Sequence, residues 1–282
     1  MIKDIRIKPL HLIILFISLQ LFIGLLTDGF CLSFDESIWH YIGRNWFRNG
    51  LPPYSGGIDN KSPLIFSIFG LSDLLFGVNY WFPRILGIIF QSIGILYIFR
   101  IANHIAGRQA GIIAMTLYGL SLLWSHAGGK DVSYTESYSV TFTILAVYKF
   151  LTAKNDKDLF LSGFIGGIGF GFRYTSLLVV IAVFITLVKS KRKGFIQFGA
   201  GLLISVLFII AIFYLGGVNM KGLIFHSLID NFSPGSVTDH PILWKMESLL
   251  NGLFYSELVL FYPLFHPASQ ARPSCRILCA CR

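Results

Sequence analysis

Residues 9–27 read PLHLIILFISLQLFIGLLT, and residues 34–37, a short way after them, read FDES. The first stretch is a continuous apolar run of about the 20 residues that a transmembrane helix needs. Asp35 and Glu36 follow it at the edge of the apolar region, where charged side chains are costly to place and usually have a function. This order predicts a membrane protein with chemistry that begins at Asp35.

The composition supports the same class. Of the 282 residues, 54% are hydrophobic, 16% are aromatic and only 13% are charged, with a net charge of +9. These proportions are typical of an integral membrane protein. The basic residues cluster in short stretches between apolar runs, where they orient transmembrane helices, so we expect no nucleic-acid partner.

Apolar stretches bounded by charged residues recur along the chain. They lie at residues 9–27, 82–102, 109–129, 134–153, 158–172, 174–188 and 194–216, with a weaker candidate at 249–265. The predicted fold class is therefore all-α, a polytopic membrane protein with about seven or eight transmembrane helices. The first run follows Lys3, Arg6 and Lys8 as in a signal peptide, but no small-residue cleavage site comes after it, which favours a retained anchor.

The basic residues also predict the orientation. Lys and Arg concentrate on the cytoplasmic side of alternating loops, so a cytoplasmic amino terminus puts the basic cluster at residues 189–193 inside and residues 28–81 outside. The same rule makes residues 62–76 an interfacial or re-entrant helix of the external loop and splits residues 158–188 around Arg173. We expect glycines near residue 167 to let that pair pack closely.

With this orientation, charged residues that are far apart in the sequence share the external face. They are Asp35, Glu36, Lys61, Asp131, Glu136 and Arg173. This convergence predicts an extracytoplasmic active site where the helices open outward. The alternative is that charged residues simply collect at helix ends.

The external loop itself predicts two helices. Polar residues recur every four positions from Glu36 to Arg48, and apolar residues fill the opposite side from Ile38 to Trp46, which indicates an amphipathic helix lying flat on the membrane. Residues 50–57 break it, and Pro63 suits the first turn of the next helix.

Several motifs together resemble the GT-C glycosyltransferases of the protein O-mannosyltransferase and aminoarabinose-transferase type. They are Asp35-Glu36, Gly50-Leu51-Pro52-Pro53-Tyr54, Asp59-Asn60-Lys61-Ser62-Pro63, Arg84 and the Gly-rich segment from Ser162 to Tyr174. The resemblance covers residues 5–215. The chain departs from the family pattern at Ser62, where a second proline is usual, and at Arg173, where a lysine is usual.

The resemblance implies transfer of a sugar from a polyprenyl-phosphate donor, of the dolichyl or undecaprenyl type, to a hydroxyl of a protein, lipid or glycan acceptor, with inversion. Asp35 then suits the general base, and Glu36 would orient the acceptor or pair with a cation. Lys61, Arg173 and Arg84 suit the donor phosphate, because fixed cations stabilise the charge that develops there.

Each of these roles has a structural alternative. Asp35 could cap a helix, Lys61 could extend its ammonium to the membrane interface, and Arg173 could serve as a polar turn residue. Glu136 and Asp131 compete for the position of the family's second-loop acid, and Glu136 is favoured because it opens the next helix.

We predict no cofactor and no structural metal, although the acidic groups are compatible with a divalent cation. Residues 1–265 form the predicted membrane domain. The segment 266–282 changes abruptly to a basic composition with Cys275, Cys279 and Cys281. Its cysteine spacing could bind a metal, but without a partnering histidine a disordered tail, from a truncated or frame-shifted gene product, is favoured.

The competing functions are a lipid or sugar transporter and an inactive remnant of a glycosyltransferase. A transporter usually holds its charges near the middle of the membrane and repeats its halves, whereas here the charges gather at one surface. An enzyme of this class would lie in the cell membrane of a prokaryote or in the endoplasmic reticulum of a eukaryote.

Overall fold

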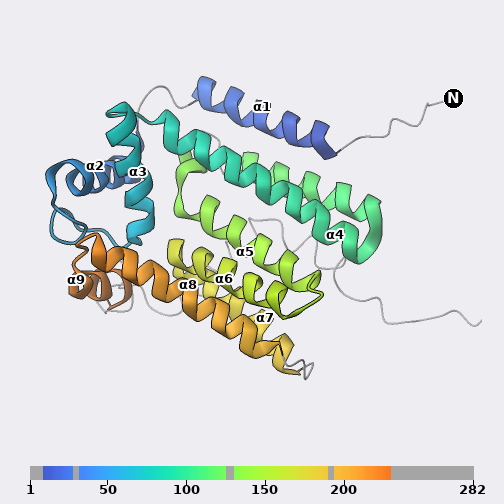
Figure 1. The fold of residues 1–282 in the computed structure, drawn as a ribbon. Coiled ribbons are helices and arrows are strands. Elements are labelled where there is room, and N and C mark those ends of the chain that lie inside the picture. The colour runs from blue at the N-terminus through green and yellow to red at the C-terminus, as the bar shows by residue number, and fades with distance from the viewer. Residues whose placement is uncertain (1–8, 28–31, 125–129, 190–193, 230–282) are drawn as a thin grey trace, which may run out of the picture. The chain divides into compact units, whose positions relative to one another are not determined.

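The computed structural model describes residues 9–27, 32–124, 130–189 and 194–229, and the elements in these ranges are all helical (Figure 1). They belong to the first of two compact units, Met1–Asn231. The elements are α1 Pro9–Thr27, α2 Phe34–Asn49, α3 Pro63–Phe76, α4 Trp81–Trp124, η1 Lys130–Ser133, α5 Thr135–Leu151, α6 Asp156–Phe172, η2 Tyr174–Ser176, α7 Leu177–Lys189, α8 Phe195–Leu215, α9 Met220–Ile224 and the π-helix η3 Phe225–Ile229. The candidate crossing at 249–265 and the tail at 266–282 lie outside the described residues.

Helix α4 is a hairpin of two segments. Its backbone leaves the helical conformation at Gly107, where φ is 85° and ψ is 176°. A methyl group added at Gly111 would lie 2.9 Å from the ring of Phe99, so the two segments run back along each other (Figure 1). The bend falls between the predicted stretches 82–102 and 109–129, at a positive φ that glycine adopts without strain.

Two helices in the described part of the chain are long and apolar enough to cross a membrane, namely Trp81–Leu123, which contains the bend, and Phe195–Leu215. Shorter apolar helices lie at Pro9–Phe22, Pro63–Phe76 and Tyr174–Val188. The all-helical class is therefore confirmed within these residues. The number of crossings and their orientation stay predictions.

Helices α6 and α8 run in parallel and touch through their backbones. A methyl group at Gly163 would lie 2.0 Å from the carbonyl oxygen of Phe198, and one at Gly167 would lie 1.7 Å from Ser205 Oγ. Small residues at four-residue spacing are the usual way for helices to approach this closely in a membrane. The predicted close packing of the glycines is therefore present.

Helix α2 buries one half of its polar side. The helix has the predicted range, and Gly50 ends it in the left-handed conformation at φ 65°. Glu36 and His40 on the polar side are 0% and 4% exposed, whereas Arg44 and Arg48 on the same side are exposed. Glu36 and His40 are buried because they find charged partners on neighbouring helices, which the prediction of a helix lying flat on the membrane did not include.

One of these partners lies in α3, within the stretch that appeared apolar. Asp73 is 1% exposed and accepts hydrogen bonds from the guanidinium of Arg48, with His40 Nε2 at 3.8 Å from its carboxylate. A buried carboxylate needs such partners. This contact fixes α2 against α3.

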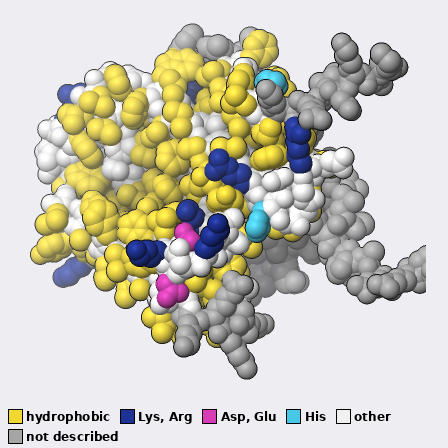
Figure 2. Space-filling model, turned by 45° about the vertical axis from the view of Figure 1, so that its right-hand side comes forward, with side chains coloured by type: hydrophobic (Ala, Val, Ile, Leu, Met, Phe, Trp, Pro, Cys, Tyr) yellow, Lys and Arg dark blue, Asp and Glu magenta, His cyan; other side chains and the backbone are white. Residues whose placement is uncertain are grey.

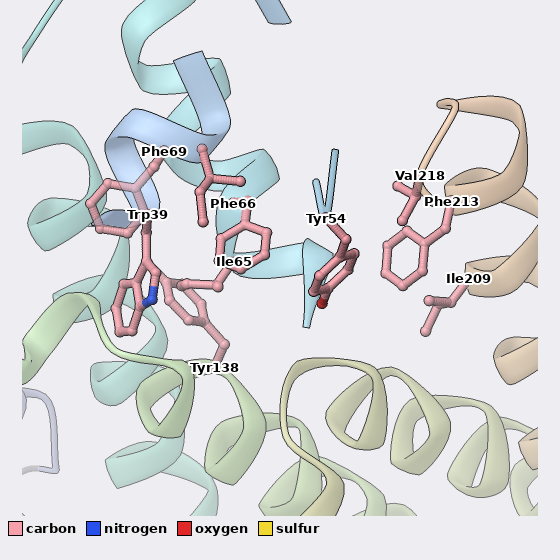
Figure 3. Packing of buried hydrophobic residues seen from close by; sticks show 10 residues of the cluster. Trp39, Tyr54, Ile65, Phe66, Phe69, Tyr138, Ile209, Phe213 and Val218 are labelled. Carbon is pink, nitrogen blue, oxygen red and sulfur yellow. The ribbon is translucent and has the colours of Figure 1, made fainter. Parts of the chain in front are cut away.

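A core of aromatic and aliphatic side chains joins α2, α3, α5 and α8 (Figure 3). Its buried members are Trp39, Ile42, Tyr54, Ile65, Phe66, Phe69, Tyr138, Ile209, Phe213 and Val218. In Figure 3, Tyr54 lies between the group on α3 and the group on and after α8. Tyr54 thus connects the loop after α2 to the last helices described.

The end of the helices that lies away from α2 and α3 carries many basic residues. Arg100 and Arg108 flank the bend of α4, and Lys149 near the end of α5 lies 3.9 Å from Asp158 at the start of α6. Figure 2, which brings this side forward, shows Lys and Arg side chains gathered around a few acidic ones within a hydrophobic surface. In Figure 1 the bend of α4 lies on the right, away from α2 and α3 on the left.

The contact between α6 and α8 predicts a difference between two glycines. Gly163→Ala should lower the free energy of unfolding by about 1–3 kcal/mol, because the added methyl has no space beside the Phe198 backbone. Gly199→Ala is the matched control, since its methyl would meet only a Phe184 carbon at 3.8 Å. Thermal unfolding in detergent should show a lower Tm for the first variant only; equal Tm values would contradict the close contact.

Candidate active site

Most of the predicted site residues lie at the end of the helices opposite the basic turns. Asp35 and Glu36 are in the first turn of α2, Lys61 lies just before α3, Glu136 is in the first turn of α5, and Arg173 directly follows α6. Because α5 and α6 are antiparallel, the start of one meets the end of the other. In the described part of the chain these residues therefore lie at one end of the helices, while their shared function stays a prediction.

Asp35 is partly buried and is not the helix cap. Ser33 caps α2, with its hydroxyl accepting from the Glu36 N–H at 3.2 Å. The carboxylate of Asp35 makes no hydrogen bond or ion pair with the described residues. It therefore remains available, near the positive end of the α2 dipole that stabilises its negative charge.

Glu36 is fully buried and held from several sides. Arg84 donates to it through Nε at 2.9 Å and through a terminal nitrogen at 2.7 Å. Ser133 Oγ donates to Oε1 at 2.6 Å, and the Ser33 N–H donates to Oε2 at 2.8 Å. A carboxylate with this many donors is held firmly in place. Glu36 thus joins α2, α4 and η1, and the backbone next to it carries Asp35.

Arg84 has a different position from the other predicted cations. It is 6% exposed, holds Glu36 in a two-pronged ion pair, and lies over the ring of Tyr80 at 5.1 Å. The structure brings Arg84 to the site but aims its charge at Glu36. Of the two roles predicted for Glu36, pairing with a neighbouring cation is the one that this geometry shows.

The loop before α3 supplies a second acid that the sequence analysis quoted only as part of a motif. Asp59 Oδ2 accepts a hydrogen bond from Trp39 Nε1 at 2.7 Å. Burial raises the pKa of the Asp59 carboxyl, opposed by this hydrogen bond and by the charge of Lys61, while the charge of Asp35 raises it further. Asp35 and Lys61 are therefore close enough for their charges to act on Asp59.

Lys61 is partly buried, and its ammonium forms no hydrogen bond or ion pair with the residues described. Its backbone carbonyl accepts a hydrogen bond from the Tyr54 hydroxyl at 2.6 Å. The backbone of the lysine is thus anchored while its charge stays available for a ligand.

Glu136 and Arg173 form an ion pair across the ends of α5 and α6, and Arg173 also reaches Thr175 at 3.2 Å. Both side chains are partly exposed, at 48% and 37%. Such a pair is weakly held and can exchange partners. The backbone of Asp131 lies in η1, and its side chain lies outside the described residues.

Two aromatic side chains meet close to the start of α2. Trp39 and Tyr134 meet edge to face with centroids 5.0 Å apart, and the Tyr134 hydroxyl lies 3.2 Å from Ser33 Oγ. Tyr134 was not predicted, although its place directly before the helix that begins with Glu136 was a usable signal.

The comparisons with known proteins agree with this geometry. A family model described as dolichyl-phosphate-mannose-protein mannosyltransferase matches residues 60–215. The match covers more than half of the chain and includes Lys61, Arg84, Glu136 and Arg173. The fold and the match together define a membrane glycosyltransferase of the GT-C type. The chain belongs to the dolichyl-phosphate-mannose-protein mannosyltransferase family, as its motifs predicted. No curated protein and no solved structure matches it.

Replacing Glu36 or Glu136 by glutamine should lower the free energy of unfolding by different amounts. Glu36→Gln leaves the guanidinium of Arg84 buried beside a neutral group, so it should cost about 3–5 kcal/mol of stability. Glu136→Gln, the matched control, breaks a half-exposed pair and should cost about 1 kcal/mol or less. Thermal unfolding in detergent measures both. A Glu36→Gln variant as stable as the control would show that the pair with Arg84 does not hold the fold.

Proposed function

We propose that the chain transfers a sugar from a polyprenyl-phosphate donor to an acceptor hydroxyl on the extracytoplasmic side, with inversion at the anomeric carbon. The observation that carries the proposal is the contrast between two adjacent acids. Glu36 is buried and paired, whereas Asp35 has no hydrogen bond or ion pair among the described residues. A general base needs a carboxylate that is free to accept a proton on a backbone that is held in place, and Glu36 holds the backbone beside Asp35.

Asp35 acts on the acceptor. Its carboxylate takes the proton of the acceptor hydroxyl as that oxygen attacks the anomeric carbon, and the bond from that carbon to the donor phosphate oxygen breaks in the same displacement. The electron pair of the broken bond stays on the phosphate. Inversion follows, because the hydroxyl attacks from the side opposite the departing phosphate.

The cations act on the donor. The leaving lipid phosphate gains negative charge, and fixed positive groups aimed at it stabilise the transition state. Lys61 is the first cation that would bind the phosphate, since its ammonium has no ion-pair partner among the described residues. Arg173 is the second cation, because its weak pair with Glu136 can be exchanged for a phosphate. Arg84 contributes indirectly, by holding Glu36.

The acceptor would approach past the aromatic side chains and Asp59. The family description names a protein acceptor and a mannose donor, and a protein hydroxyl is the acceptor class we propose to test first, alongside lipid and glycan hydroxyls. The raised pKa of Asp59 makes it suited to donate a hydrogen bond to a sugar or acceptor oxygen.

We also propose that α1, both segments of α4, α5, α6, α7 and α8 cross the membrane, with the amino terminus cytoplasmic. The supporting observation is that the basic segments near Arg100 and Lys157 lie at the end of the helices opposite the site. The positive-inside rule then puts the site outside.

The general-base assignment predicts a large loss of rate in one variant. Asp35→Asn should lower kcat by about 100-fold to 10,000-fold, because the amide cannot accept the proton, with little change in Tm. Asp158→Asn, at the far end of α6, is the matched control and should keep the wild-type rate. The measurement is transfer of radiolabelled sugar from a polyprenyl-phosphate donor in vesicles. Full activity of Asp35→Asn would remove this residue from the proton transfer.

The orientation predicts which residues a membrane-impermeant thiol reagent can reach. In a background where the native cysteines are replaced by serine, Ser55→Cys should react in intact cells or sealed vesicles of right-side-out orientation. Lys157→Cys, in the first turn of α6 at the basic end of the helices, should react only after permeabilisation. The reverse pattern would overturn the proposed orientation without affecting the fold.

A further inference from the structure

Ser227 lies in the π-helix Phe225–Ile229, beyond the residues that the family model matches. Its side chain is 1% exposed. Its hydroxyl lies 2.8 Å from the hydroxyl of Tyr54 and 3.5 Å from the carbonyl oxygen of Lys61. It also forms a hydrogen bond with the side chain of Tyr174. One buried serine therefore contacts segments that are far apart in the sequence.

One of these hydrogen bonds has a fixed direction. The Tyr54 hydroxyl donates its single proton to the Lys61 carbonyl, which can only accept. The Ser227 hydroxyl lies between the hydroxyls of Tyr54 and Tyr174. The result is a hydrogen-bonded chain that links Tyr174, Ser227, Tyr54 and the backbone of Lys61.

Each end of this chain adjoins a candidate phosphate-binding cation. At one end the hydrogen bond holds the backbone of Lys61, and at the other Tyr174 directly follows Arg173. The intervening Tyr54 has a φ of 65°, the left-handed conformation that a non-glycine side chain adopts only when its surroundings hold it there. Tyr54 is 5% exposed, and its ring stacks on His226 at 6.1 Å between centroids. Strained backbone and π-helices both concentrate at functional sites.

We propose that Ser227 is a positioning residue that sets the spacing of Lys61 and Arg173, so that one phosphate group can meet both cations. Ser227 does not touch the phosphate and acts only through Tyr54 and Tyr174. The inference rests on the proposed function, since the phosphate is that of the lipid-linked donor. Without the serine hydroxyl, the two loops lose their common hydrogen-bond partner, and the cations hold the phosphate less well.

The test measures binding of undecaprenyl phosphate to the full-length protein in nanodiscs, with undecaprenol, which has no phosphate, as the reference ligand. Ser227→Ala should raise the Kd for undecaprenyl phosphate about fivefold, the size expected for the loss of one buried hydrogen bond, and leave undecaprenol unaffected. Ser205→Ala removes a hydroxyl that is equally buried in α8 and bonds only locally, so it should bind as the wild type does. Ser227→Thr keeps a hydroxyl and should restore affinity.

A second arm separates positioning from general loosening of the fold. In a Lys61→Ala, Arg173→Ala background, Ser227→Ala should cause no further loss of affinity, because its effect passes through those two cations. The same fivefold loss in that background, or wild-type affinity of the single variant, would overturn the proposal. If Ser227→Ala does not fold, Tyr54→Phe breaks the same chain and decides the question by the same measurements.

The outcomes distinguish this inference from the proposed function. If wild-type protein binds undecaprenyl phosphate but transfers no sugar, the proposed enzymatic activity is wrong. The comparison of Ser227→Ala with wild type would still test the positioning role. Wild-type protein that binds undecaprenyl phosphate and transfers sugar, with Ser227→Ala unchanged in affinity, would overturn only the positioning role.

Discussion

The buried ion pair between Glu36 and Arg84 is the contact on which the site depends. Two charges removed from water are stable only when they are close and when their remaining hydrogen-bonding groups are also satisfied. Glu36 meets both conditions through Arg84, Ser133 and the Ser33 N–H. Because α2, α4 and η1 all contribute, the first turn of α2 has a fixed place among these elements.

The buried ion pair gives the adjacent acids Glu36 and Asp35 different roles. Successive side chains on a helix point about 100° apart, so when Glu36 faces the interior Asp35 must face another direction. The carboxylate of Asp35 therefore stays partly accessible while its backbone is held by its neighbour. An acid pair on a mobile loop would have neither property.

The helices were predictable from sequence because apolar length and flanking charge determine them. The predicted stretches 134–153, 158–172 and 194–216 correspond to α5, α6 and α8 within a few residues. The meeting of Glu136 with Arg173 could also be predicted, because antiparallel neighbours bring the start of one helix to the end of the other.

The partners of buried polar groups could not be predicted from the sequence. Nothing in the sequence links Glu36 to Arg84 or Arg48 to Asp73, and the amphipathic pattern of α2 was read as if its polar side faced water. The left-handed Tyr54 and the bond from its hydroxyl to Ser227 depend on tertiary contacts and have no local signal.

The burial of His40 between α2 and α3 makes the position of α2 sensitive to acid. Burial lowers the pKa of His40 below its ordinary value of 6.5; the charge of Asp73 opposes this, and that of Arg44 adds to it. The neutral imidazole is therefore the form that the folded protein prefers, and its contribution to stability is complete above about pH 6.5 and is lost as the pH falls through the lowered value. Protonation would add a charge beside Arg44 and Arg48 in the layer between α2 and α3. An acidic medium would thus loosen the helix that carries Asp35, so that acid lowers turnover by weakening the support of the site.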